Sequence, residues 1–454
     1  MLERLALRLT ALAERYMPDA FVFALAATLL TVLAAFVVDP AVREEPQRVV
    51  LAWGNGFWEL SKFTLQMSMI IIGGYVLASS PPIARLITWL AAKPRTGPGA
   101  IATVALAAML TSLFNWGFSL IFSALFAKAV ARRLQGVDYR ALGAASFLGL
   151  GTVWAQGLSG SAALQMASVT SMPKALAETI GAIPLSETIF RWQSLVCVSV
   201  EVVVVTLVVY FAAPRIGQDA RALGVDLGEE ARPADPPAAT PGERWERSPW
   251  MLQSVVALGF AYLALSISSR AATLVDGLNA LDVNTLNLVL LLLGAALHRT
   301  PAAFMHAVKS ATPAVWGVLL QFPFYAGISG IMTGTTLSHA MANLFVNASS
   351  AGAYPALVTI YSAVLGVFVP SGGSKWVIEA PYVLGAAKSL GVPAGWMVVT
   401  YDLGEAVANL VQPFWMLPIL ALLGLKARDV IGHTFLVAVI LFPLILVLVT
   451  VLRP

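Results

Sequence analysis

The sequence predicts an all-α polytopic membrane protein with about nine transmembrane helices and two re-entrant hairpins in an inverted repeat. The first observation is composition: 58% of the 454 residues are hydrophobic, 11% are charged, and the mean hydropathy is +0.80, whereas soluble domains carry about 25% charged residues. The second is that the apolar runs are continuous, while the strands of a membrane barrel alternate with a period of two. The third is that several apolar runs are interrupted by Gly, Pro, Ser and Asn.

The charged residues set the expected topology. The net charge of +4 requires no nucleic-acid partner, because Lys and Arg of membrane proteins concentrate in cytoplasmic loops. Residues 1–19 form a basic lead-in, and no small-x-small cleavage site follows promptly. We therefore predict a retained first helix and a cytoplasmic N-terminus. The single cysteine, Cys197, lies in an apolar run and has no partner for an internal disulfide.

The first half of the chain, 1–213, is predicted to be one repeat that contains a hairpin at 100–130. This apolar segment is broken at Asn115-Trp116-Gly117, and the arm 100–114 reaches about 22 Å as a helix, less than the ~30 Å of the hydrocarbon core. Both flanks are basic, which favours a hairpin that enters from the cytoplasm. The flanking basic residues are Lys93, Arg95, Lys128, Arg132, Arg133 and Arg140. The predicted spans are 20–38, 61–79, 141–170 (broken at 157–161) and 192–213.

The second half follows a polar, proline-rich stretch at 214–249 that is typical of a flexible cytoplasmic linker. A connecting helix at 250–270 leads into the second repeat, 271–454. The apolar stretch 355–390 is broken at 368–376, and its flanks carry little positive charge, so we predict a hairpin that enters from outside. The alternative is an ordinary loop outside the membrane. The other predicted spans are 284–297, 314–332, 394–423 (broken at 409–413) and 434–451.

The two halves correspond at a shift of 255 residues. Asn115-Trp116-Gly117 falls on Pro370-Ser371-Gly372, Ser119 falls on Ser374, and Gly157 falls on Gln412. The predicted repeats start on opposite sides of the membrane. This is the inverted-repeat architecture of transporters, in which broken helices meet near the midplane.

Several motifs resemble the bacterial short-chain fatty acid (acetoacetate/butyrate) transporter family, over nearly the whole chain and most specifically in its second half. The motifs are Trp53-Gly54-Asn55-Gly56-Phe57-Trp58, Asn115-Trp116-Gly117-Phe118, the run from Gln321 to Gly327, Pro370-Ser371-Gly372-Gly373 with Trp376, and Gln412-Pro413-Phe414-Trp415.

The resemblance implies a place in the ion transporter superfamily and a location in the bacterial cytoplasmic (inner) membrane. Dicarboxylate–sodium members of that superfamily use two opposed hairpins, form dimers and move in an elevator-type manner. Those members carry Ser-Asn-Thr at both hairpin tips, whereas this chain has Asn115-Trp116-Gly117 and Pro370-Ser371-Gly372. The departure fits a monocarboxylate better than a dicarboxylate and leaves the coupling cation, proton or sodium, open.

A carboxylate substrate needs hydrogen-bond donors with little fixed charge, because it must also leave. The N-termini of half-helices provide N–H groups and a positive dipole end. Trp116 and Trp376 are candidates to wall a short acyl chain, the alternative being packing or an interfacial belt. Gln66 and Gln321 match between the repeats and are therefore candidates for a functional role. The alternative is that each only makes an interhelical hydrogen bond. The predicted substrate-binding residues are Asn115, Trp116, Gly117, Ser119, Ser159, Ser161, Gln321, Pro370, Ser371, Gly372, Gly373, Ser374, Lys375, Asn409 and Gln412.

Charges within apolar runs call for explanation, because each costs roughly 2.5–3.5 kcal/mol at the bilayer centre. Glu405 lies four residues before Asn409, and with Asp402 it is the candidate for cation coupling; the alternative is a structural acid. Lys375 is placed to attract the anion, the alternative being a lysine that snorkels to water, and Glu379 lies one turn from it. A sodium ion near Asn115 and Ser371 is the predicted metal site. Glu201 is interpreted as structural.

No enzyme constellation stands out, since the chain has no Walker loop and its four histidines are scattered. We expect a cation symporter for short-chain monocarboxylates. The alternatives are a dicarboxylate or amino-acid-derivative carrier of the same superfamily and, less favoured, an anion channel. The expected partners are a small carboxylate, the lipid bilayer and a second copy of the chain, with no cofactor beyond a co-transported proton or sodium ion.

Overall fold

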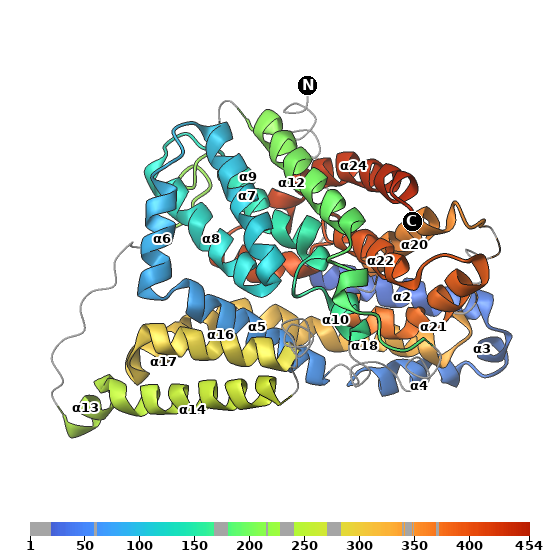
Figure 1. The fold of residues 1–454 in the computed structure, drawn as a ribbon, viewed down its shortest axis with the longest axis horizontal. Coiled ribbons are helices and arrows are strands. Elements are labelled where there is room, and N and C mark those ends of the chain that lie inside the picture. The colour runs from blue at the N-terminus through green and yellow to red at the C-terminus, as the bar shows by residue number, and fades with distance from the viewer. Residues whose placement is uncertain are drawn as a thin grey trace.

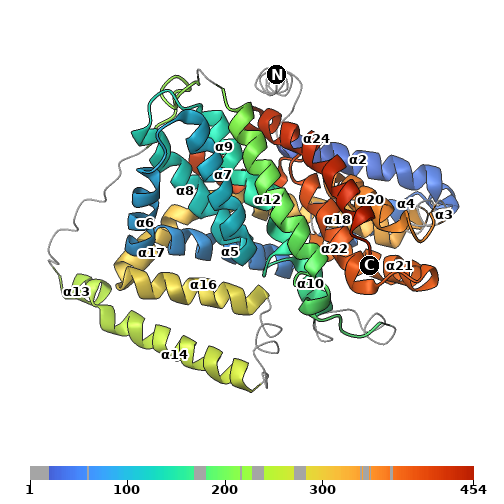
Figure 2. The same ribbon diagram turned by 45° about the horizontal axis from the view of Figure 1, so that its top comes forward.

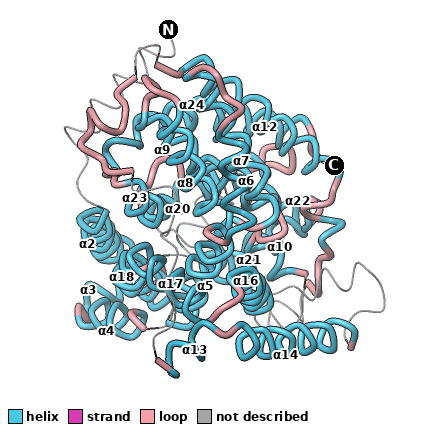
Figure 3. The backbone as a smooth tube through the Cα atoms, turned by 90° about the vertical axis from the view of Figure 1, so that its left-hand side faces the viewer, coloured by secondary structure: helices cyan, strands magenta, loops and turns pink. Residues whose placement is uncertain are grey.

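The computed structural model describes residues 20–58, 61–167, 180–214, 217–227, 240–269, 283–337, 340, 347, 349–368 and 372–454. Every regular element in these ranges is a helix (Figure 3). The all-α prediction is therefore confirmed for the described part of the chain.

The N-terminal helices run across the molecule from α2–α4 at the right of Figure 1 to α6 at the left, and three of them, α2, α4 and α5, pack on a later helix, α18. They are α2 (Ala20–Val38), α3 (Pro40–Glu44), α4 (Gln47–Gly56), α5 (Ser61–Ala78) and α6 (Pro81–Ala91), and α18 spans Trp316–Gly334. Helices α4 and α18 approach each other through glycines: a Cβ atom on Gly56 would lie 2.6 Å from the Cα of Gly330. Small residues at such contacts are how membrane helices pack closely.

The centre of the molecule is built from α7 (Gly97–Phe114), α8 (Trp116–Arg133) and α9 (Tyr139–Leu148), which pack on one another. Helix α9 continues into a π-helical turn, η1 (Gly149–Val153), a 3₁₀ turn, η2 (Trp154–Gln156), and the short helix α10 (Ser161–Met166). The predicted break at 157–161 is thus confirmed, and residues 168–170 of that predicted span lie outside the described residues.

Two groups of helices flank this centre (Figure 2). One is a layer along α5 made of α14 (Pro249–Ser268), α16 (Val283–His298) and α17 (Pro301–Ala311), which the 3₁₀ turn η5 (Thr312–Ala314) joins to α18. The other pairs α12 (Trp192–Ala212), which follows the short 3₁₀ turn η4 (Leu185–Glu187), with the last helix, α24 (Ala427–Val451). Helix α13 (Pro241–Arg247), capped by Thr240, occupies part of the predicted flexible linker, so that stretch is not loop throughout.

The C-terminal helices carry the second predicted hairpin. They are α20 (Tyr354–Phe368), α21 (Gly372–Leu390), α22 (Ala394–Ala408), the 3₁₀ turn η6 (Phe414–Met416) and α23 (Leu417–Leu423). Helices α20 and α22 pack tightly because a glycine lies at the contact: a Cβ atom on Gly404 would be 2.2 Å from the carbonyl oxygen of Thr359. The break predicted at 409–413 separates α22 from η6, as expected.

Five described helices are long and apolar enough to cross a membrane, and the number rises to seven if two bent pairs each count as one span. The bends are 71° between Thr64–Ala78 and Pro81–Ala91, and 51° between Pro301–Ala311 and Trp316–Met332. Helix α7 begins at Gly97 and has 18 residues, which is longer than the arm predicted from residue 100 and sufficient by itself for a span. The chain is a multi-pass membrane protein, while the nine spans and the inverted repeat stay predictions.

Candidate functional site

The first helix break is a single residue, Asn115, which ends α7 and begins α8. Its side-chain oxygen accepts a hydrogen bond from the backbone N–H of Phe118 (2.9 Å), so Asn115 acts as the N-cap of α8. The hydroxyl of Ser119 donates to the carbonyl of Ala108 (2.6 Å), eleven residues earlier, which joins the two helices side by side. This arrangement is the geometry of a helical hairpin.

The tip of this hairpin is anchored on the broken segment that follows α9. The backbone N–H of Trp116 donates to the hydroxyl of Ser159 (3.0 Å), and the N–H of Leu158 donates to the carbonyl of Leu113 (2.8 Å). Gly117 packs so closely on α5 that a Cβ atom there would overlap the side chain of Ile70. The non-helical backbone is therefore covered by protein, which is the condition for its presence at membrane depth.

The second predicted tip contacts the same broken segment. A Cβ atom on Gly372 would lie 3.2 Å from the Trp154 ring, and one on Gly373 would lie 3.2 Å from the Cβ of Ser161. Pro370 and Ser371 lie outside the described residues, and Ser374 is described only as helical backbone. Ser159 and Ser161 thus lie on the short stretch of chain that contacts both tips.

Side-chain hydrogen bonds join helices α20 and α21, which lie before and after the second tip in the sequence. The hydroxyl of Tyr354 donates to the carbonyl of Val383 (2.8 Å), and the hydroxyls of Tyr361 and Tyr382 are 3.1 Å apart. These bonds connect the first half of α20 to one turn in the middle of α21, while the re-entrant hairpin at this position stays a prediction.

A buried ion pair lies beside the second tip. Lys375 and Glu405 contact each other, with 3% and 1% of their side-chain surfaces exposed. The Lys375 ammonium also donates to the carbonyl of Ser362 (2.9 Å) and lies 5.0 Å from the Tyr401 ring centroid. The alternative of a lysine that snorkels to water is therefore wrong, because the charge is held inside the protein.

Two more carboxyl groups are buried in the same region. Glu379 and Asp402 are each 2% exposed, and both interact electrostatically with Lys375 and Glu405. One oxygen of each, Oε2 of Glu379 and Oδ1 of Asp402, has no hydrogen-bond partner in the described structure. Glu379 was not among the predicted site residues, although its position one turn after Lys375 was the signal that could have placed it there.

The cluster of these four side chains has an excess of acid. Three ionised carboxylates beside one ammonium would leave two negative charges uncompensated. Burial of uncompensated charge is strongly unfavourable, so the cluster must hold protons or a bound cation. Within the described ranges, no three His, Cys, Asp or Glu side chains converge as metal ligands. The sodium site near Asn115 and Ser371 stays a prediction, since Ser371 lies outside those ranges.

Asn409 and Gln412 are engaged by the chain itself at the break after α22. The amide nitrogen of Gln412 donates to Asn409 Oδ1 (2.9 Å), and Gln412 Oε1 accepts from the N–H of Phe414 (2.7 Å). The amide nitrogen of Asn409 lies 3.4 Å from the carbonyl oxygen of Leu150 in η1. These two side chains close the helix break and join it to the other broken segment. Their contact with a substrate stays a prediction.

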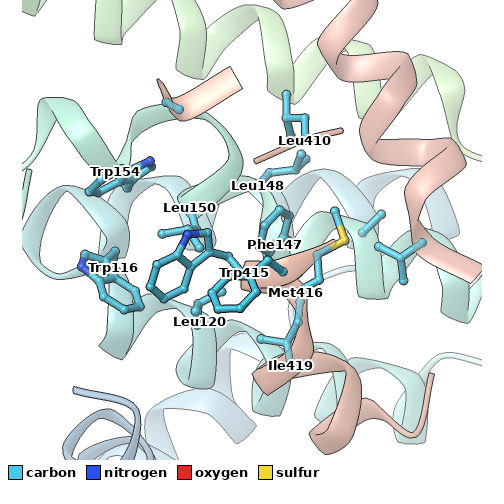
Figure 4. Packing of buried hydrophobic residues seen from close by; sticks show 14 of the residues in the cluster. Trp116, Leu120, Phe147, Leu148, Leu150, Trp154, Leu410, Trp415, Met416 and Ile419 are labelled. Carbon is cyan, nitrogen blue, oxygen red and sulfur yellow. The ribbon is translucent and has the colours of Figure 1, made fainter. Parts of the chain in front are cut away.

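The predicted aromatic residues are buried and pack on other rings, so the interfacial-belt alternative is wrong for both. Trp116 lies edge-on to Trp415 (5.1 Å between ring centroids), and Figure 4 shows these two indoles together with Trp154 at one side of the core. Trp376 contacts Tyr401 (4.5 Å) next to Lys375. Trp154 and Tyr401 were not predicted as site residues, and their proximity to the tips became visible only in three dimensions.

The matched glutamines of the two halves differ. Gln66 donates to Asn284 on α16 (2.8 Å), which confirms the interhelical hydrogen bond for that residue. Gln321 is fully buried, and neither its oxygen nor its nitrogen has a partner among the described residues. An unpaired buried amide is costly, so Gln321 remains a candidate ligand.

A family model described as "Short chain fatty acid transporter" matches residues 1–453. The chain is 36% identical over 438 residues to a "Putative short-chain fatty acid transporter" of Escherichia coli (95% of this chain, 96% of that one). It is 32% identical over 455 residues to a protein of the same name from Haemophilus influenzae (98% and 99%).

Two solved structures are similar over nearly the whole chain at low identity. The YdaH transporter of Alcanivorax borkumensis gives a TM-score of 0.46 at 16% identity, with 96% of this chain and 97% of that one covered. MtrF of Neisseria gonorrhoeae, described as one of a class of antimetabolite efflux pumps, gives a TM-score of 0.45 at 12% identity, with 96% of this chain and 97% of that one covered.

Proposed function

The chain belongs to the short-chain fatty acid transporter family, and we propose that it is a secondary active transporter which carries a short-chain monocarboxylate, such as butyrate or acetoacetate, together with a cation. One observation carries the proposal beyond family membership: the buried Lys375–Glu405 pair at the second tip, within a cluster that has excess acid. Such intramembrane charges mark substrate and ion pathways by default.

The pair suggests how one proton is coupled to one carboxylate. In the described structure Glu405 forms an ion pair with Lys375. Protonation of Glu405 releases the ammonium, which then pairs with the carboxylate of the substrate. The exchange conserves charge, because the site gains one proton and one anion together. Gradient-driven accumulation therefore requires Glu405 to bind and lose a proton, and Asp402 and Glu379 tune that step.

The single ammonium in the described cluster favours a monocarboxylate over a dicarboxylate, since it offers one charge for one carboxylate. The acyl part of the substrate would lie against the aromatic surface of Trp154, Trp376 and Tyr401, which surrounds the second tip. Ser161 and the N–H groups at the start of α21 would complete the hydrogen bonds to the carboxylate. Two hairpins that meet on one broken segment fit an elevator-type movement of a hairpin-bearing domain in a homodimer.

Uptake into proteoliposomes tests this function. Labelled butyrate or acetoacetate is supplied with an imposed proton gradient, an imposed sodium gradient or neither. We expect accumulation above empty liposomes under the proton gradient, and its loss in Lys375→Met, which removes the charge while keeping an unbranched side chain. Equal retention by protein-containing and empty liposomes under both gradients would refute the transporter assignment for these substrates. Accumulation under the sodium gradient alone would identify sodium, and not the proton, as the coupling cation.

A further inference from the structure

Helix α12 carries a buried acid outside the cluster described above. Glu201 is fully buried, although this helix is largely exposed, with Leu195, Val203 and Phe211 on its outer surface. The amide nitrogen of Gln156 donates to Glu201 Oε1 (2.7 Å). Gln156 is the last residue of η2, three positions before Ser159.

The Gln156–Glu201 pair lacks one donor. Gln156 Oε1 and Glu201 Oε2 are both buried, and in the described structure neither has a hydrogen-bond partner. Both atoms are acceptors if Glu201 is ionised. One proton on Glu201 Oε2 removes the charge and supplies the missing donor, so that the carboxylic acid and the amide can bind each other through two hydrogen bonds. A buried acid–amide pair satisfied in this way is far less costly than a buried carboxylate.

The surroundings provide no opposite charge to stabilise a carboxylate. The elements that pack most on α12 are α7, α24 and η1, and neither α7 nor the segment 149–156 has an ionisable side chain. On α24, His433 lines a separate small cavity with Val208 and Ala212, at the far end of α12, and Arg428 and Asp429 lie at its first turn. On α12 itself the one ionisable neighbour is Cys197, a turn away.

We propose that Glu201 is a second proton-binding site, occupied in this conformation and separate from the Lys375–Glu405 pair. The proposal rests on the proposed function for its role: Gln156 continues through Gly157 to the segment that contacts both tips. Movement of that segment withdraws the amide, and Glu201 then releases its proton to water. Return of the segment restores the pair, and Glu201 takes a proton from water again. The site thereby links protonation to the position of the tips.

Infrared spectroscopy of purified protein tests the protonation without any transport. We expect the wild type at neutral pH to show the C=O absorption of a buried carboxylic acid that is lost in Glu201→Gln. The replacement amide can still exchange two hydrogen bonds with Gln156, so this variant should fold. The swapped variant Gln156→Glu/Glu201→Gln rebuilds the pair and should restore the band. No band lost in Glu201→Gln would overturn the proposal.

A transport measurement tests the link to the tips. An internal pH-sensitive dye reports protons entering per labelled butyrate in proteoliposomes. We expect Glu201→Gln to lower this ratio while butyrate counterflow continues, and an unchanged ratio would overturn the role in coupling. If the wild type takes up no butyrate, the proposed function fails, and the infrared band still decides whether Glu201 binds the proton.

Discussion

The Lys375–Glu405 pair allows a quantitative prediction. Glu405→Gln removes the carboxylate that contacts the buried Lys375 ammonium, and leaves the carbonyl and hydroxyl of Ser362 as its hydrogen-bond partners in the described structure (2.9 and 3.4 Å). Removal of one partner from a buried ion pair costs roughly 3–5 kcal/mol. An unfolding entropy of about 2.1 cal/mol/K per residue makes 1 kcal/mol equivalent to about 1 °C in this chain of 454 residues. Glu405→Gln should therefore lower the apparent Tm by about 3–5 °C.

The double variant Lys375→Met/Glu405→Leu removes both charges and fills a similar volume. Replacement of both partners is often neutral or stabilising, so we expect its Tm near that of the wild type. The assay is tryptophan fluorescence during heating in detergent. The single variant Lys375→Met completes the double-mutant cycle with the wild type, Glu405→Gln and the double variant. A double variant whose loss equals the sum of the two single losses would refute the coupling between these residues.

The single variant Glu405→Gln also distinguishes proton coupling from substrate binding. A glutamine at position 405 resembles the protonated acid, so Lys375 stays free to bind the substrate carboxylate. We expect Glu405→Gln to abolish accumulation driven by a proton gradient and to retain counterflow exchange of butyrate. Accumulation at the wild-type level would remove Glu405 from the mechanism.

Two further predictions concern the packing and the loops around the site. Gly404→Ala places a methyl group 2.2 Å from the Thr359 carbonyl oxygen, so overpacking should cost about 1–3 kcal/mol and lower the Tm. The control variant Gly385→Ala meets no atom within 4 Å and should not lower the Tm. Equal Tm values for the two variants would contradict the close contact of α20 and α22. Asp39 accepts a hydrogen bond from the Thr336 N–H (2.9 Å), which lowers the pKa of its carboxyl group below its ordinary value of 3.8. The stability from this contact is present above the ordinary pKa and is lost as the pH falls through the lowered value. The Tm of Asp39→Asn should therefore depend less on acid pH than the Tm of the wild type. Identical dependence of Tm on pH in the two proteins would contradict the contact.

Local features of the site could be predicted from the sequence because their cause is local. Asn115 interrupts an apolar run, which predicted the helix break found there; the structure adds that Asn115 is the N-cap of the helix that follows. The breaks at Gly157 and after Asn409 likewise follow from residues that end helices. The apolar composition dictates the helical class in the same way.

Long-range pairing could not be predicted in this way. Nothing in the sequence near Lys375 specifies that Glu405, thirty residues later, contacts it, so the alternative of a snorkelling lysine stayed open. Gln66 and Gln321 match in sequence, but only Gln66 finds an amide opposite it. Glu379 was missed because spacing places it near Lys375 on a helix without revealing that the acids outnumber the base.

The accessibility of Ser161 tests the binding site most directly. The background is Cys197→Ala, which removes the single native cysteine, and the measured quantity is the reaction rate of Ser161→Cys with a membrane-impermeant thiol reagent. Ser161 is half-buried against Gly373, and the control is Ser389→Cys on the exposed end of α21. A carboxylate site between the two tips predicts slow labelling at position 161 that butyrate slows several-fold further, with no effect of butyrate at position 389. Fast labelling at position 161 that butyrate does not change would contradict it.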